Sequence, residues 1–214
     1  MALTLEIEGW CDGERIPSKY AFGRAGVQTP FELSENINPL VHWHTVPQGV
    51  RSFALICHDA DVPSVGDSVN IEGKVVPIDL PRVDFYHWVQ VDIPSDLREI
   101  AEGASSRKVT PRGKGIEVSS LGRSGMNDYT NWFEGDSQME GVYGGYDGPC
   151  PPWNDSLVHR YYFTLYALDI KTLPLSGAFT GAKAIEAMQG HIIESSVYSG
   201  VYAINPDAKL VEGV

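Results

Sequence analysis

Alternation of hydrophobic and polar residues, the period of a half-buried β-strand, recurs along most of this chain. The first such run is Leu3-Thr4-Leu5-Glu6-Ile7. Later runs are short and nearly all apolar, or rich in aromatic and β-branched residues, as is typical of buried strands. The pattern predicts strands at residues 3–7, 41–43, 51–59, 87–93, 159–168 and 195–204.

Helical periodicity is confined to smaller parts of the chain. Apolar residues recur at intervals of about one turn in residues 180–193, and Thr180 is suited to cap the start of this helix. A short helix is also predicted at residues 95–105, where Ser95 is a suitable N-cap and acidic residues follow in the first turns.

Segments rich in turn-forming residues separate these elements. Residues 62–82 and 105–136 are predicted as two long loops, and residues 141–152 form the strongest turn cluster. No internal repeat, low-complexity tract or interdomain linker is visible. The sequence therefore predicts one β-rich domain over residues 1–214, with helices at its periphery.

Composition and charge narrow the functional classes. Of the 214 residues, 43 % are hydrophobic and 21 % are charged, which is typical of a folded globular chain. The formal net charge of −12 repels phosphate backbones, so a nucleic acid is not the expected partner. The main group of basic residues is interpreted as a solvated loop; it comprises Arg107, Lys108, Arg112 and Lys114.

The chain also lacks the usual marks of membrane insertion and of a secreted disulfide framework. No apolar run approaches the ~18 residues that a membrane helix requires, and no signal peptide is visible at the N-terminus. The three cysteines are widely spaced and contain no CxxC pair, so neither a disulfide framework nor a zinc site is expected. We expect a cytoplasmic protein.

Three polar residues fall on faces that otherwise point to the core. Asp59 ends one predicted strand, whereas His87 and His159 begin two others. Residues of equal parity share a face. The expected neighbours are Phe53, Leu55 and Cys57 for Asp59, Val89, Val91 and Ile93 for His87, and Tyr161, Phe163 and Leu165 for His159. If the first strand is antiparallel to the others, all three side chains lie at one edge of the sheet.

A carboxylate beside two imidazoles predicts a particular chemistry. Asp59 accepts a ring N–H and favours the imidazolium form, and the opposite ring nitrogens are then expected to donate hydrogen bonds into a pocket. The nearby loop adds backbone N–H groups, with Gly148 for close approach and Pro149 for stiffness. This set suits a phosphate or a carboxylate.

Other readings of the same residues stay open at this point. Each histidine is individually more typical of a structural or solvated position, and Asp59 is also typical of a turn. The cluster at residues 141–152 is equally consistent with an inert turn. Two histidines and a carboxylate also occur in metal sites, but no HxH or HxxxH pair accompanies them here, and no metal or cofactor is predicted.

Three motifs surround these residues. His58-Asp59-Ala60-Asp61-Val62-Pro63-Ser64 has two acids before a proline, His87-Trp88-Val89 opens a strand, and the run Gly144–Pro152 leads to His159-Arg160-Tyr161. Together they resemble the signatures of the phosphatidylethanolamine-binding protein family, in its prokaryotic Raf-kinase-inhibitor-like branch. Weaker similarity extends over most of residues 3–204.

The resemblance implies a mainly β fold, an antiparallel β-sandwich with a few peripheral short helices and one C-terminal helix. It also implies a small anion pocket near the surface; its residues would be Asp59, His87, Gly148, Pro149, Cys150, His159 and Tyr161. Two departures stand out. Ala60 replaces a proline, which is expected to loosen that turn, and the long segment at residues 62–82 is expected to cover or reshape the pocket mouth.

The predicted function is therefore that of a binding protein, with a possible regulatory role. Its partner would be a phosphorylated or carboxylated small molecule or head group, and a homodimer is expected from the resemblance. The alternative is a hydrolase that uses the Asp/His pocket on a phosphoester or acyl ester, with Cys150 as candidate nucleophile. A scaffold whose pocket is incidental is a third interpretation.

Overall fold

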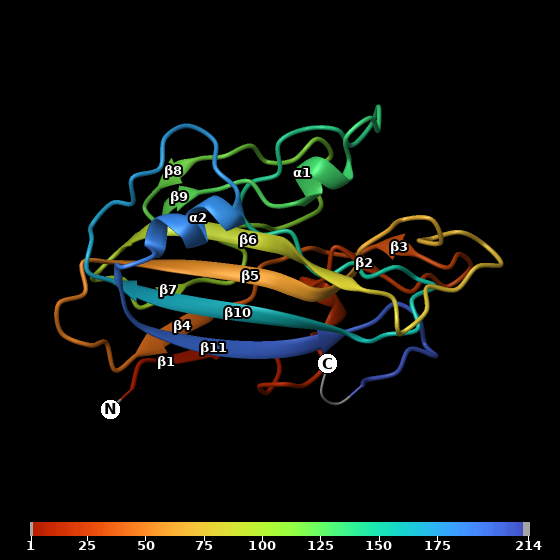
Figure 1. Ribbon diagram of the computed structural model, residues 1–214, viewed down its shortest axis with the longest axis horizontal. Coiled ribbons are helices and arrows are strands. Elements are labelled where there is room, and N and C mark those ends of the chain that lie inside the picture. The colour runs from red at the N-terminus through yellow and green to blue at the C-terminus, as the bar shows by residue number, and fades with distance from the viewer. Residues whose placement is uncertain (1, 212–214) are drawn as a thin grey trace.

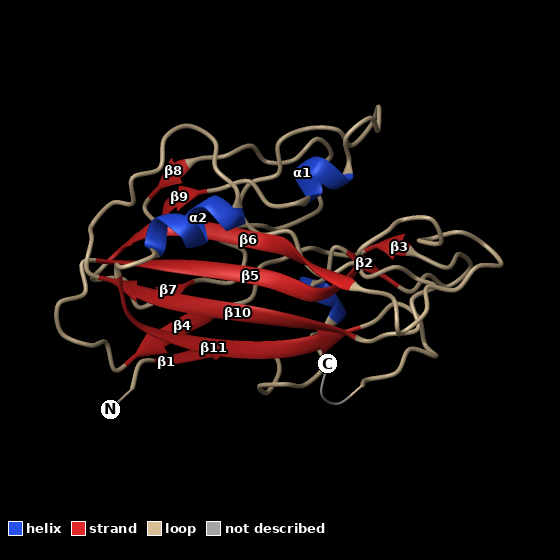
Figure 2. Ribbon diagram, viewed as in Figure 1, coloured by secondary structure: helices blue, strands red, loops and turns tan. Residues whose placement is uncertain are grey.

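A six-stranded antiparallel sheet dominates the computed structural model, which describes residues 2–211 (Figures 1 and 2). Its strand order is β11-β10-β5-β6-β9-β8. The strands are β5 (Ser52–Pro63), β6 (Arg82–Pro94), β8 (Val118–Ser119), β9 (Gly122–Ser124), β10 (His159–Leu168) and β11 (Ile192–Tyr202). The long central strands β5 and β10 are apolar and almost wholly buried, because both faces of the sheet are covered.

A smaller sheet, in the order β1-β4-β7, packs over one face of the large sheet. It contains β1 (Thr4–Ile7), β4 (Val41–His44) and β7 (Glu99–Ile100). Trp43 of β4 meets Phe53 of β5 edge to face, with 5.4 Å between ring centroids. The prediction of a mainly β, antiparallel fold is confirmed, and a sandwich is an approximate description of these two layers.

Strict alternation along β5 divides the interior into two clusters. Phe53, Leu55 and Cys57 face the smaller sheet, whereas Ala54 and Ile56 face the other side. There they pack against helix α2 (Gly181–Met188), which crosses the large sheet in Figure 1. The predicted face of Asp59 is therefore confirmed.

Helix α2 is shorter than predicted. The Thr180 side chain accepts a hydrogen bond from the N–H of Lys183, so the cap is confirmed. The helix ends at Met188 rather than residue 193, because Ile192 pairs with Leu168 in the sheet. Sheet pairing outweighs the helical period there.

The helix predicted at residues 95–105 is wrong. Turns and strand β7 occupy this segment, Ile100 is fully buried, and the N–H of Trp43 donates to the carbonyl of Arg98. Edge pairing with β4 therefore replaces the intrahelical hydrogen bonds.

The remaining elements are short, and the sequence pattern does not predict them. They are the 3-10 helix η1 (Ser18–Tyr20), β2 (Gly23–Arg24), β3 (Glu32–Leu33) and α1 (Tyr129–Trp132). Strands β5 and β6 also extend beyond the predicted residues 51–59 and 87–93, and so shorten the loop between them. None of the helices in residues 2–211 has the length and apolarity needed to cross a membrane.

Candidate functional site

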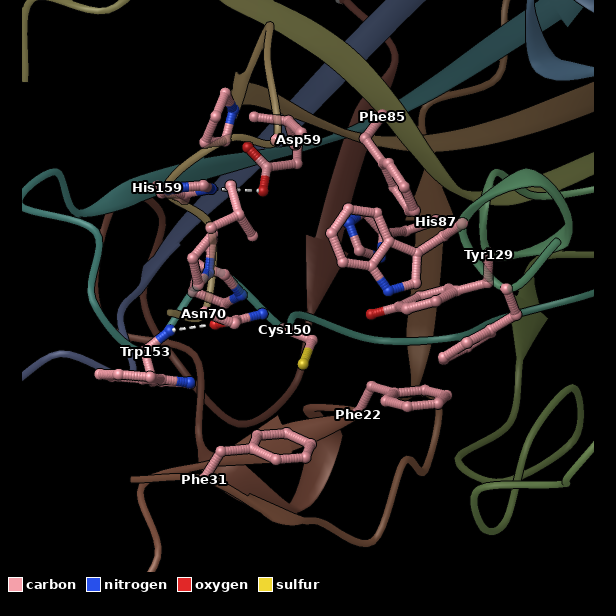
Figure 3. Close-up of a pocket in the computed structure, with 18 of the residues that line it drawn as sticks. Phe22, Phe31, Asp59, Asn70, Phe85, His87, Tyr129, Cys150, Trp153 and His159 are labelled. Atoms are coloured by element: carbon pink, nitrogen blue, oxygen red, sulfur yellow. Dashed lines mark hydrogen bonds and ion pairs between the residues drawn. The ribbon is translucent and has the colours of Figure 1, made fainter. Parts of the chain in front are cut away.

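A cavity of about 460 Å³ opens at the end of the large sheet where β10 begins, beside β2 and β3 (Figures 1 and 3). Its volume is in the usual range for a small-molecule site. Most of its lining is aromatic or aliphatic. The lining residues are Phe22, Phe31, Leu33, Asp59, Val62, Pro63, Gly66, Val69, Asn70, Phe85, His87, Tyr129, Trp132, Phe133, Met139, Cys150, Pro151, Pro152, Trp153 and His159.

The structure brings the predicted polar residues together. Strand β5 is antiparallel to both β6 and β10, so the condition for their convergence is met. The predicted residues that line the cavity are Asp59, His87, Cys150 and His159.

Three further predicted residues lie behind the cavity surface. Tyr161 is directly paired with Asp59, and its ring lies 5.3 Å from the His87 ring. Its buried hydroxyl has no hydrogen-bond partner within residues 2–211. Gly148 and Pro149 are buried, and Gly148 approaches the backbone oxygen of Tyr20 rather than the cavity. The glycine is therefore required by the close approach of Tyr20, and its contact with a ligand stays a prediction.

His87 reaches the cavity because of a β-bulge in β6. Cys57 pairs with Trp88 and His58 with Tyr86, which leaves His87 as an extra residue between them. Regular alternation would place His87 on the face of Val89. Val89 and Val91 pack in the cluster under α2, so their predicted face-sharing with His87 is wrong.

His159 is held between two carboxylates. Its Nδ1 donates to Asp59 at 2.7 Å and its Nε2 donates to Asp155 at 3.1 Å. Burial lowers the pKa of His159, but the charge of Asp59 and the contacts with Asp155 outweigh it and raise the pKa to about 9. The ring is thus an imidazolium with both N–H groups occupied. The expectation that it donates into the pocket is wrong.

Arg82 completes this ionic network. Its guanidinium binds both oxygens of Asp155, at 2.6 and 3.1 Å, in bidentate geometry. Burial raises the pKa of Asp59, but the charge and hydrogen bond of His159 outweigh it, so the pKa lies below the usual value. Two cations and two anions therefore balance in a network that reaches the cavity at Asp59 and His159; these two residues and His87 form the polar floor of the cavity.

His87 is neutral. Burial lowers the pKa of its ring to about 4, although the charge of Asp59 acts in the opposite direction. Its Nδ1–H donates to the carbonyl of Asp147 at 2.7 Å, which assigns the tautomer and leaves Nε2 as an acceptor. The Asp147 carboxylate is itself fixed by Lys114 and Asn36, each at 2.7 Å.

A wall of stacked aromatic rings forms one side of the cavity. Phe22 and Tyr129 stack with centroids 4.5 Å apart, and Tyr129 stacks on Phe133 at 5.7 Å. The Tyr129 hydroxyl donates to the carbonyl of Gly148 at 2.8 Å, which fixes the ring. Neither lysine nor arginine is among the described residues that line the cavity.

Comparisons with known proteins identify a family for this chain. The family model described as phosphatidylethanolamine-binding protein matches residues 8–203. The chain belongs to this family. A UPF0098 protein of Methanothermobacter thermautotrophicus is 32 % identical over 94 % of this chain and 98 % of its own length. The UPF0098 protein YbhB of Escherichia coli is 26 % identical over 90 % of this chain and 94 % of its own length.

Solved structures support the family fold. The putative family homologue CT736 of Chlamydia trachomatis superposes with a TM-score of 0.60 at 27 % identity, over 94 % of this chain and 97 % of that chain. YbcL of Escherichia coli superposes with a TM-score of 0.67 at 23 % identity, over 96 % and 100 %. The chain is thus a YbhB/YbcL-type member of the family.

In this family member, two residues of the ionic network, Asp155 and Arg82, were not predicted from the sequence. Asp155 lies in an irregular segment and Arg82 lies at the end of a strand, where no periodicity indicates which way a side chain points. The position of Asp155, four residues before His159, was a usable signal, but the segment Asn154-Asp155-Ser156 resembles a glycosylation sequon instead. The aromatic wall comes from separate parts of the chain and has no local signature.

The long segment after β5 forms part of the cavity wall, as expected from the family comparison. The Asn154 side chain donates to the carbonyls of Ser68, Ile71 and Lys74, and accepts from the N–H of Asn70. The turn containing Ala60 is also closed, because Asp59 accepts the N–H of Asp61 at 2.8 Å. The expected loosening at Ala60 is not seen.

Substituting Asn154 with alanine should loosen this wall selectively. Three carbonyls and one N–H would lose their partner, so hydrogen exchange of amides in residues 66–76 should accelerate by about 10–100-fold. Exchange measured by mass spectrometry tests this, with Asn131→Ala at an exposed position of α1 as the matched control. Unchanged exchange in Asn154→Ala would show that the segment is held by other contacts.

The protonation of Cys150 and the arrangement of possible metal ligands decide whether nucleophilic or metal chemistry is available at this cavity. Burial raises the pKa of Cys150 to about 12, so its thiol is a poor source of thiolate at neutral pH. No group of three or more His, Cys, Asp or Glu side chains within residues 2–211 is arranged to hold a metal ion.

Proposed function

We propose that this protein binds a small anionic molecule whose phosphate or carboxylate head lies against Asp59 and His87. The proposed head group carries one proton when it is bound, which leaves a phosphomonoester as its monoanion and converts a carboxylate to the neutral acid. The remainder of the ligand occupies the apolar part of the cavity. Family membership supports ligand binding, and the identity of the head group is inferred from the chemistry of the cavity floor.

The hydrogen-bonding pattern of the floor carries this proposal. Asp59 presents a carboxylate and His87 presents the lone pair of Nε2, so both accept hydrogen bonds. A protonated phosphate or carboxyl group supplies the hydrogen-bond donor that these two acceptors require.

Charge balance makes a monoanion acceptable there. The negative charges of Asp59 and Asp155 are offset by His159 and Arg82. A dianionic head would place two charges beside Asp59, and the one cation in the described lining, His159, already has both of its N–H groups bound to carboxylates. The bound head is therefore expected to be the protonated form.

Hydrolysis is not supported by a specific observation. His87, with a pKa of about 4, is a weak general base, and Cys150, with a pKa of about 12, is a weak nucleophile. Both values are far from those that suit catalysis near neutral pH. Binding is the function that these residues support better.

Affinity for phenyl phosphate should rise as the pH falls. The second pKa of a phosphomonoester is about 6, so above that value the population of the monoanion falls about tenfold for each unit by which the pH rises. We expect binding by isothermal titration calorimetry to strengthen by about 30–100-fold between pH 8 and pH 6, and to level off below pH 6.

Asp59→Asn should remove most of this dependence and bind more tightly than the wild type at pH 8, because the dianion then meets a neutral amide. Asp84→Asn, at an exposed carboxylate outside the cavity, is the matched control. Equal affinity of the wild type at pH 8 and pH 6 would contradict the protonated head group.

A further inference from the structure

The part of the cavity beyond Asp59 and His87 is built mainly from aromatic rings. Figure 3 shows Tyr129 and Phe22 on one side, with Phe31 and Trp153 around the remaining space. These rings come from segments far apart in the sequence. Their common feature is that they all border the same cavity.

The aromatic wall is rigid before any ligand arrives. Phe22, Tyr129 and Phe133 form a compact group in which the Tyr129 plane is inclined by 17° to each of the other two rings, whose centroids lie 5.9 Å apart. Phe133 is backed by the buried Tyr143 ring at 5.3 Å, and Tyr143 donates its hydroxyl to the Met139 carbonyl at 2.8 Å. Binding therefore requires little ordering of these side chains.

The geometry favours a ring over a flexible chain. Phe85 meets Tyr129 edge to face, with centroids 5.2 Å apart and planes inclined by 80°, and both residues line the cavity. Aromatic groups gain from stacked and edge-to-face contacts beyond the effect of buried area. A linear alkyl chain gains only the area effect and also loses conformational freedom.

We propose that the physiological ligand is an aryl compound, in which a planar ring is joined to the protonated anionic head. This inference rests on the proposed function for the position of the anionic head group, and adds that the rest of the ligand is an aromatic ring. The ring packs against Tyr129 and Phe133, and the head points towards Asp59 and His87. Free inorganic phosphate would occupy only the polar end of the cavity.

A set of matched phosphates tests whether the part of the ligand beyond the head group is aromatic. At pH 6, titration calorimetry should show phenyl phosphate binding about 100-fold more tightly than inorganic phosphate, from the apolar area of one ring. It should bind about 3–10-fold more tightly than cyclohexyl phosphate, which has the same carbon count without the aromatic system. Equal or weaker binding of phenyl phosphate relative to cyclohexyl or n-hexyl phosphate would overturn the aryl assignment.

Two cavity variants and one control test where the ring of the ligand lies. Phe133→Leu keeps an apolar, half-buried side chain and should abolish the preference for phenyl over cyclohexyl phosphate, while inorganic phosphate binds as in the wild type. Trp153→Leu is a second variant of the same kind on the other side of the cavity. Tyr162→Leu, which removes an aromatic ring that stacks on His58 outside the cavity lining, should leave all affinities unchanged. A preference that survives both cavity variants would overturn the proposal.

Binding of benzylamine distinguishes an error in the proposed aryl site from an error in the proposed anionic head group. If benzylamine binds and phenyl phosphate does not, the anionic head group is wrong and the aryl site stands. If inorganic and phenyl phosphate bind equally, the head group stands and the aryl site is wrong. If none of these compounds binds, both proposals are wrong.

Discussion

Substituting His159 with phenylalanine should lower the free energy of unfolding at pH 7 by about 3–5 kcal/mol, because it leaves buried carboxylates without their shared cation. His159 is fully buried and contacts both Asp59 and Asp155. Urea denaturation measures the loss. The control is His191→Phe, which breaks an exposed ion pair with Asp169 and should change stability by less than about 1 kcal/mol.

The pH dependence separates this electrostatic effect from a packing defect. The pKa of His159 is raised from 6.5 to about 9, so the folded state binds the proton more tightly than the unfolded state. Its stabilisation is complete below about pH 6.5 and is lost as the pH rises through about 9, by up to about 3 kcal/mol. The variant should lack this decline. Parallel curves for wild type and variant between pH 6.5 and 9 would contradict the imidazolium.

Gly148→Ala should destabilise the protein by at least about 3 kcal/mol or prevent folding. A Cβ atom at this position would overlap the backbone oxygen of Tyr20, which also accepts the Tyr146 hydroxyl at 2.6 Å. Neither partner is the free end of a flexible side chain, so the overlap requires backbone movement.

Gly66→Ala is the matched control for Gly148. A Cβ atom at Gly66 meets no atom within 4 Å, so this variant should remain within about 0.5 kcal/mol of the wild type. Denaturation of both variants by urea measures the difference. Equal stability of the two would mean that the Tyr20 segment can move away from Gly148 at little cost.

Strand periodicity was sufficient to predict the framework that surrounds the site. Strand β10 has the bounds predicted for it, because alternation and β-propensity agree along residues 159–168. Prediction failed where pairing with another strand decided the outcome. Residues 95–105 have a helical start signal, but the edge of β4 is nearby and pairs with them, and no local pattern reports that proximity.

Part of the site was also predictable from strand periodicity. Parity and antiparallel direction were enough to bring Asp59 and His159 together, because both follow regular pairing. Asp155 lies in an irregular segment and accepts the second N–H of His159. His159 therefore has no N–H group left to donate into the cavity. Sequence spacing suggests donors at the cavity, whereas the structure has mainly acceptors.

The bulge at His87 has a consequence for transplanting this site into other proteins. Its position, not only its identity, depends on one extra residue in β6 between the partners of Cys57 and His58. Deleting the preceding Tyr86 would let His87 pair with His58 and turn the imidazole to the α2 side of the sheet. A designed protein that copies the three polar side chains onto regular strands would therefore lack the site, whereas one that also copies the insertion would keep it.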